Sequence, residues 1–158
     1  MAPSTTPLQY RVFKLKFKLA MQDPDMPQPR YHHIIFVESN PKDGSGIKFH
    51  NSKTLHSSEL LGWTDAANFK NKFDQVLKAC PPPPQQKAFN TKTMKNELFK
   101  TKSPLTFYGP NEKRRPLKKC TEWTEEQAIP ALRVAGLIGT KKASPSPPGS
   151  RPGSRGKN

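Results

Sequence analysis

Residues 11–19, RVFKLKFKL, alternate strictly between lysine and large apolar side chains over most of their length. Successive side chains of a β-strand point to opposite faces of its sheet, so an extended chain would separate the two kinds completely. The apolar set is Phe13, Leu15, Phe17 and Leu19, and the lysines are Lys14, Lys16 and Lys18. The pattern predicts a half-buried strand, with the apolar set on one face and the lysines on the other.

A β-hairpin is predicted between residues 31–39 and residues 47–51. The run Ile34–Val37 reads as a buried strand, and the segment NPKDGSG follows it closely. Asn-Pro, Asp-Gly and two glycines in seven residues form a strong turn signal. The alternating residues IKFH then supply the return strand, so we expect the hairpin to close around residues 43–46.

A helix is predicted within residues 57–79, where apolar residues recur at spacings of three and four. The segment CPPPP ends it, because proline cannot continue a helix and pushes the preceding residue toward extended geometry. Residues 85–116 are basic and only weakly periodic. Within them, PLTFYG is the one segment that favours a strand.

A second helix is predicted in KKCTEWTEEQAIPALRVAGLIG, which begins at residue 118. Thr124 and Gln127 fit a capping box at its start. Pro130 would kink or divide the helix, and Gly136 would cap its end. Cys120 would then lie at or just before a helix N-terminus.

Composition limits this chain to a small core, since 32% of its 158 residues are apolar and 18 are proline. We predict an α+β fold, in which two main helices pack on a small antiparallel sheet. Residues 10–139 would form this single domain. Residues 1–9 would be a flexible N-terminus, and the Pro-, Ser- and Gly-rich basic segment 140–158 a disordered tail.

The net charge of +15 is concentrated in two places. Residues 87–119 carry ten Lys or Arg against two Glu, and the tail carries five basic residues and no acid. Such a surface favours contact with a polyanion, either nucleic acid or acidic lipid headgroups, although a solvated face is the more frequent outcome. The candidate polyanion-binding residues are Lys113, Arg114, Arg115, Lys118 and Lys119.

Neither a membrane span nor a signal peptide is recognisable, which predicts a protein of the cytosol, with the nucleus as the alternative. Cys80 and Cys120 are too few for a disulfide framework and would be free thiols there. Of the two, Cys120 is better placed to react, because a helix N-terminus and two adjacent lysines favour the thiolate. The alternative is that it is a small buried apolar residue.

A thiol nucleophile needs a base and an orienting polar group. The hairpin would bring His33 and His50 together, because both lie at the ends of their strands away from the turn. His33 shares its face with Ile35, whereas His32 points the opposite way. We expect His56, in the polar segment TLHSSE, to be an ordinary exposed residue.

The chain has, in this order, a strand that begins with His, a second His on the return strand and a late helix that begins at Cys. This order resembles that of the circularly permuted papain-like proteins. These include lecithin:retinol acyltransferase-like acyltransferases and thioesterases, and they are distantly related to NlpC-type peptidases. The resemblance implies Cys120 as nucleophile, His33 as base and His50 as orienting residue. Ile34 and Lys119 stand where that group has an aromatic residue and an Asn, so retention of the fold with weakened or lost catalysis is an alternative. The chain also resembles small fungal proteins without an established activity.

Other chemistries have little support in the sequence: no phosphate-binding glycine loop and no zinc spacing is present, and no cofactor is predicted. The leading hypothesis is a thiol-dependent hydrolase or acyltransferase acting on an acyl-bearing substrate. The alternative is a non-catalytic basic module that binds a polyanion, since aromatic residues interleave with the basic ones. These aromatics are Phe89, Phe99, Phe107 and Tyr108.

Overall fold

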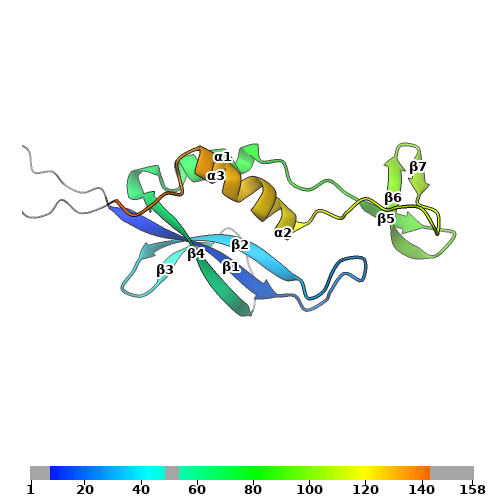
Figure 1. Cartoon of the computed structure of the whole chain (residues 1–158), viewed down its shortest axis with the longest axis horizontal. Helices are drawn as coiled ribbons and strands as arrows, with labels where there is room; N and C mark the ends of the chain where they lie inside the picture. Colours follow the sequence, from blue (N-terminus) through cyan, green and yellow to red (C-terminus); the bar gives the residue numbers. More distant parts are fainter. Residues whose placement is uncertain (1–7, 49–53, 143–158) are drawn as a thin grey trace, which may run out of the picture.

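A four-stranded antiparallel sheet forms the main body of the protein (Figure 1). The computed structural model describes residues 8–48 and 54–142. The sheet has the strand order β3-β2-β1-β4, so β1 lies between β2 and β4 and pairs with both. Its strands are β1 (Gln9–Lys18), β2 (Tyr31–Asn40), β3 (Ser45–Lys48) and β4 (Leu55–Asp65).

The predicted strand at residues 11–19 is confirmed as β1, but its lysine face is only partly solvated. Val12 on that face is fully buried in the core beneath the helices, and Lys14 beside it is 6% exposed. Leu15 and Phe17 belong to a separate cluster with Ile34. The helices therefore cover the Val12–Lys14 face, and the apolar face predicted from the alternation packs elsewhere. The reason is that carboxylates from neighbouring elements neutralise Lys14 where it is buried.

The predicted hairpin is confirmed in β2 and β3. Val37 lies opposite Ile47 and Glu38 opposite Gly46. Asp43 holds the turn, because its carboxylate accepts hydrogen bonds from the backbone N–H of Ser45 (2.8 Å) and from the Asn40 side chain (2.9 Å). The described part of β3 ends at Lys48, so His50 lies outside the described residues.

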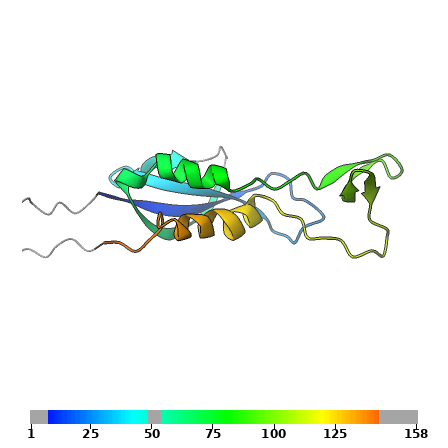
Figure 2. The same cartoon turned by 90° about the horizontal axis from the view of Figure 1, so that it is seen from above.

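Two helical segments lie side by side over one face of this sheet (Figure 2). The first is α1 (Asn71–Ala79), which follows the short 3-10 turn η1 (Ala66–Asn68). The second is continuous and consists of α2 (Cys120–Trp123), the π-helical turn η2 (Thr124–Ala128) and α3 (Ile129–Val134).

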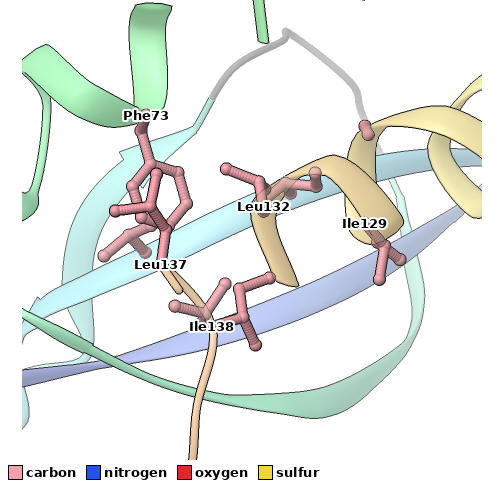
Figure 3. Close-up of a cluster of buried hydrophobic side chains, with 9 residues drawn as sticks. Phe73, Ile129, Leu132, Leu137 and Ile138 are labelled. Carbon is pink, nitrogen blue, oxygen red and sulfur yellow. The ribbon is translucent and has the colours of Figure 1, made fainter. Parts of the chain in front are cut away.

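The main core lies between these helices and the sheet (Figure 3). Phe73 of α1 and Leu132 of α3 are both fully buried there. The remaining buried members are Val12, Ile35, Val37, Ala128, Ile129, Leu137 and Ile138. Each large apolar side chain buried in this way contributes about 1.5–3 kcal/mol, so this cluster is the principal source of stability.

The helix predicted within residues 57–79 is confirmed only in its second half. Residues 57–65 belong to β4, which pairs with β1 and forms a further bridge through Trp63 and Gly139. The backbones approach closely at this bridge: a Cβ atom on Gly62, whose φ is +150°, would lie 2.6 Å from the Gly139 carbonyl oxygen. Pairing with these distant segments outweighs the local helical spacing.

The late helix begins at Cys120, with Lys119 as its N-cap residue, which confirms the predicted position of Cys120 at a helix N-terminus. The Glu122 carboxylate accepts a hydrogen bond from the Lys119 backbone N–H at 2.8 Å, so the capping box predicted at Thr124 is wrong. Thr124 is instead 2% exposed inside η2. The helix is not divided near Pro130; the irregularity there is the π-helical turn η2, which ends at Ala128 just before it. Gly136 ends the helix with φ +69°.

Residues 87–107 form a second antiparallel sheet at the far end of the molecule (Figure 1). Its strands are β5 (Lys87–Asn90), β6 (Lys95–Lys102) and β7 (Leu105–Phe107), in the order β5-β6-β7. Only β7 was expected from the sequence. Its core is small: Leu98 packs with Met26 and Leu117, and Tyr108 lies against them.

The α+β class is confirmed, with two antiparallel sheets and two helical segments. The predicted domain limits of 10 and 139 lie close to the described ends, where Lys142 still contacts Gln9 and Asp65. Most of the predicted tail, 143–158, lies outside the described residues, as do residues 1–7. Among the described residues, no helix combines the length and apolar character needed to cross a membrane.

Candidate functional site

Three consecutive residues at the entry to β2 contact three consecutive residues at the start of α2, in reverse order. The pairs are Arg30 with Glu122 (2.8 Å), Tyr31 with Thr121 (3.1 Å) and His32 with Cys120 (3.1 Å). The first is an ion pair and the second a hydrogen bond from the Thr121 hydroxyl to the Tyr31 carbonyl. We call these six residues the clasp. It fixes the helix start against the strand.

The innermost pair of the clasp joins a thiol to an imidazole. His32 Nδ1 lies 3.1 Å from Cys120 Sγ, and Cys120 is half-buried. This is hydrogen-bond distance for sulfur, with the donor set by the imidazole tautomer. Cys80 differs, because its thiol donates to the Val76 carbonyl within its own helix (3.4 Å). Cys120 is therefore the thiol that has a proton-accepting side chain within reach.

His33, which the sequence assigned as the base, contacts a carboxylate instead. It is 8% exposed, and its Nδ1 lies 3.4 Å from Glu125 Oε1. The hydrogen-bond partner of the Cys120 thiol is His32, the histidine expected to point away. The structure thus corrects the pairing between the two adjacent histidines.

His32 contacts the thiol because α2 begins beside the backbone of β2. Ile35, which was predicted to share a face of the strand with His33, does face the helices. However, Thr121 bonds the Tyr31 carbonyl, and strand carbonyls point within the plane of a sheet, toward a neighbouring strand. A residue beside the edge of a strand can contact side chains from either face of the sheet. Cys120, next to Thr121, therefore contacts His32.

A pocket of about 360 Å³ opens beside the pair. Its walls come from β2, α1 and the late helix. The lining residues are His32, His33, Ile34, Ile35, Asp74, Leu77, Lys78, Cys120, Trp123 and Thr124. Four of these ten residues, Ile34, Ile35, Leu77 and Trp123, are apolar, and the charged Asp74 and Lys78 both come from α1. The pocket brings both histidines and the thiol to one cavity.

A cluster of charged groups lies behind the pocket. Lys14 Nζ lies 2.7 Å from both Glu125 Oε1 and Glu59 Oε2. Burial lowers the pKa of His33 below its ordinary value, although the charge of Glu125 acts in the opposite direction. Burial also acts to lower the pKa of Lys14, but the two carboxylates outweigh it and raise that pKa. His33 is thus kept neutral while Lys14 is kept charged.

The lysines that precede Cys120 are both engaged by carboxylates. Lys118 pairs with Glu126 and Lys119 with Asp23. Burial of Asp23 opposes its ionisation, but Lys119 and Lys87 outweigh this and hold the pKa of Asp23 far below its ordinary value. The lysines therefore anchor the chain ahead of Cys120, and their nearest charged partners are acidic side chains.

The predicted polyanion-binding segment is likewise partly used within the chain. Arg114 lies 3.8 Å from Asp25, and the Arg115 guanidinium stacks over Phe99 at 5.2 Å from the ring centre. Lys113 is exposed. Within residues 8–48 and 54–142, Lys113 is thus the member of the predicted set that forms no ion pair or ring contact.

Sequence reasoning missed His32, Asp23 and Glu125 as residues around the thiol. Only His32 had a signal, its position next to His33. Asp23 and Glu125 reach the site from a proline-rich loop and from a π-helical turn, which have no distinctive pattern. His56 is exposed, as expected, and its ring lies against that of Tyr31 with ring centres 4.2 Å apart. Within the described ranges, no three His, Cys, Asp or Glu side chains gather closely enough to hold a metal ion.

Comparison with known proteins gives one result. The model of a family of unknown function, DUF6540, matches residues 49–139, more than half of the chain. The match covers β4, α1, the second sheet and Cys120, whereas β1 and β2, with His32, precede it. Nothing among the curated proteins or the solved structures matches. The chain belongs to the DUF6540 family.

Proposed function

We propose that the protein is a thiol-dependent hydrolase or acyltransferase, with Cys120 as the nucleophile and His32 as the base. The observation that carries this proposal is the 3.1 Å contact between Cys120 Sγ and His32 Nδ1 at the edge of a pocket. Nucleophile and base within hydrogen-bond distance are the minimum arrangement for nucleophilic catalysis. The clasp supplies the rigidity that such a pair needs.

The chemistry begins with transfer of the thiol proton to His32. The sulfur then forms a bond to the carbonyl carbon of an acyl-bearing substrate, and the leaving group departs with the proton that His32 returns. The product on the protein is a thioester at Cys120. Water, or an acceptor hydroxyl or amine, attacks this thioester with His32 again as base, which releases the acyl group and restores the thiol. No cofactor is consumed.

The pocket supports an acyl-bearing substrate, because apolar side chains from three elements surround the thiol. Ile35, Leu77 and Trp123 would contact the acyl group, while Lys78 offers a positive charge from α1. The resemblance to the circularly permuted papain-like proteins also supports this proposal, with the role of base moved from His33 to His32. In this proposal His33 forms part of the pocket wall. Free thiols fit a reducing compartment, so we place the activity in the cytoplasm, with the nucleus as the alternative.

Thiol reactivity tests the pair without knowledge of the substrate. The folded protein is treated with limiting iodoacetamide at neutral pH, and modification of each cysteine is followed by peptide mass mapping. We expect Cys120 to react about tenfold or more faster than Cys80 in the same molecule, because its proton acceptor is in place. His32→Gln should remove most of this excess. His33→Gln is the matched control and should keep it.

Acyl transfer tests the catalytic step itself. The protein is incubated with an activated acyl ester, and thioester formation at Cys120 and release of the alcohol are measured. His32→Gln should slow acylation about 10²- to 10⁴-fold, as expected for loss of a general base. Cys120→Ala should abolish it. A Cys120 that stays inert until denaturation would refute the proposal, and a reactive Cys120 that never acylates would indicate the fold with lost catalysis.

A further inference from the structure

A hollow of about 500 Å³ lies on the second sheet, away from the thiol pocket. It is formed by the end of β5, the β5–β6 turn and β7. The lining residues are Phe89, Asn90, Thr91, Lys92, Leu105, Thr106 and Phe107. Phe89 is 50% exposed and Leu105 is 47% exposed, so large apolar surfaces face solvent in it. Phe89 therefore presents aromatic surface to any ligand that enters.

Three exposed lysines lie in the wall of this hollow or on the strand that pairs with its walls. Lys92 lines it directly. Strand pairing places Lys95 opposite Asn90 and Lys102 opposite Leu105. Among the residues that the structure describes, none of these three lysines forms an ion pair, in contrast to the lysines that tie the second sheet to the rest of the chain.

Within the described residues, no acidic side chain forms an ion pair with these lysines, although one of them has an acidic neighbour. Hydrogen bonds from Asn90 and Thr93, together with the charges of Arg114 and Lys95, lower the pKa of Glu97. The Glu97 carboxylate accepts hydrogen bonds from the Asn90 side chain and the Thr93 hydroxyl, both at 2.8 Å. Glu112 pairs with Lys100. The hollow thus combines an open aromatic surface with three lysines that form no ion pair among the described residues.

We propose that this hollow binds single-stranded nucleic acid, with one base stacked on Phe89 and the adjacent phosphates held by Lys92, Lys95 and Lys102. An unpaired base offers a flat π-face directly beside phosphate charges, which is the combination that this surface complements. A duplex buries its base faces in the stack, and an acidic peptide supplies charge without a comparable flat face. The site is independent of the thiol pocket.

Fluorescence anisotropy of a labelled oligouridine of about 12 nucleotides tests the proposal on the full chain. Phe89→Ala should weaken binding about 5- to 150-fold, whereas Phe89→Trp should preserve it, because stacking requires a ring. Lys95→Gln should weaken binding and lower the slope of log affinity against log salt by about 0.7. Circular dichroism verifies the fold of each variant.

The matched controls are Val134→Ala, an exposed apolar residue of α3, and Lys42→Gln, an exposed lysine of the β2–β3 turn. Both should bind as the unmodified chain does. Equal affinity of the Phe89→Ala variant, binding that ignores salt, or the same affinity for a duplex of that length would overturn the proposal. Displacement of the RNA by polyglutamate at equal charge would assign the surface to an acidic protein instead.

Discussion

The two sheets of this protein are stabilised in different ways. The four-stranded sheet and the two helical segments enclose a cluster of nine buried residues. In the described part of the chain, Leu98 of the second sheet packs against two buried side chains, Met26 and Leu117. Ion pairs supplement the smaller core: Lys87 lies 2.8 Å from Asp23 and 2.7 Å from Asp25. The four-stranded sheet is therefore stabilised mainly by apolar burial, and the second sheet mainly by ion pairs to the loop before β2. Cys120 lies between these two regions.

The polar contacts that hold the second sheet lie at the residues just before Cys120. Asp23 pairs with Lys87 at the start of β5 and with Lys119, the residue that precedes Cys120. Gln86 adds a two-sided bond to the Lys118 backbone, since its amide donates to the carbonyl (2.6 Å) and accepts from the N–H (2.9 Å). The segments entering and leaving the second sheet are thus joined to each other next to the site.

The largest effect is expected from Leu132→Ala in the main core. Leu132 is fully buried between α3 and the sheet, so truncation should lower the free energy of unfolding by about 2–5 kcal/mol through lost contacts and a residual cavity. Urea unfolding followed by circular dichroism measures this. Val134→Ala, on the exposed side of the same helix, is the control and should change stability by less than about 0.5 kcal/mol.

A smaller and local effect is expected from Leu98→Ala in the second sheet. Its cluster has few members, so the cost should lie near the lower end of the range, about 2 kcal/mol. Hydrogen exchange read by mass spectrometry should show faster exchange in residues 87–107, with β1 and β2 unchanged. If hydrogen exchange in β2 became faster by the same factor, the two sheets would unfold as one unit, and their separate stabilisation would be refuted.

The smallest effect, about 1 kcal/mol, is expected from Asp23→Asn, which removes a charge from two partly exposed ion pairs. Because the pKa of Asp23 is lowered by folding, its contribution is complete above the unfolded value near about 3.9 and is lost as pH falls toward the lower folded value. The stability difference between the two proteins should therefore be full at pH 6 and shrink below about pH 4.

Two further measurements sharpen the Asp23 prediction. The variant should accelerate hydrogen exchange in residues 87–107 and around Cys120, because both of its ion pairs end there. Asp43→Asn alters a carboxylate of the β2–β3 turn and should leave exchange in the second sheet unchanged. A difference between Asp23→Asn and the unmodified protein that persists undiminished at low pH would contradict the electrostatic explanation.

Local patterns predicted the elements whose signals are contained in a few residues. Alternation predicted β1, the Asp-Gly turn predicted the β2–β3 hairpin, and the proline run predicted the end of α1. The helix that carries Cys120 at its start was also recognisable, although the capping box predicted at Thr124 was wrong. These predictions succeeded because turn geometry, strand parity and the loss of a backbone donor at proline act over only a few bonds.

Elements whose partners are distant in the chain were not predicted. β4 forms where Trp63 meets Gly139, and the second sheet closes its core with Met26 and Leu117. Neither contact leaves a periodic signal in the strand concerned. The same reason explains the buried Lys14, since the carboxylates that neutralise it come from β4 and from η2.

The sequence by itself determined that the chain is basic, that it forms a small α+β fold and that Cys120 opens a helix. Only the tertiary structure decided which histidine meets the thiol. Parity along a strand assigns side chains to faces, but α2 approaches β2 within the plane of the sheet, through Thr121 and the Tyr31 carbonyl. The hydrogen bond between Thr121 and the Tyr31 carbonyl fixes where α2 begins relative to β2. As a result the side chain of His32 contacts Cys120, and that of His33 contacts Glu125.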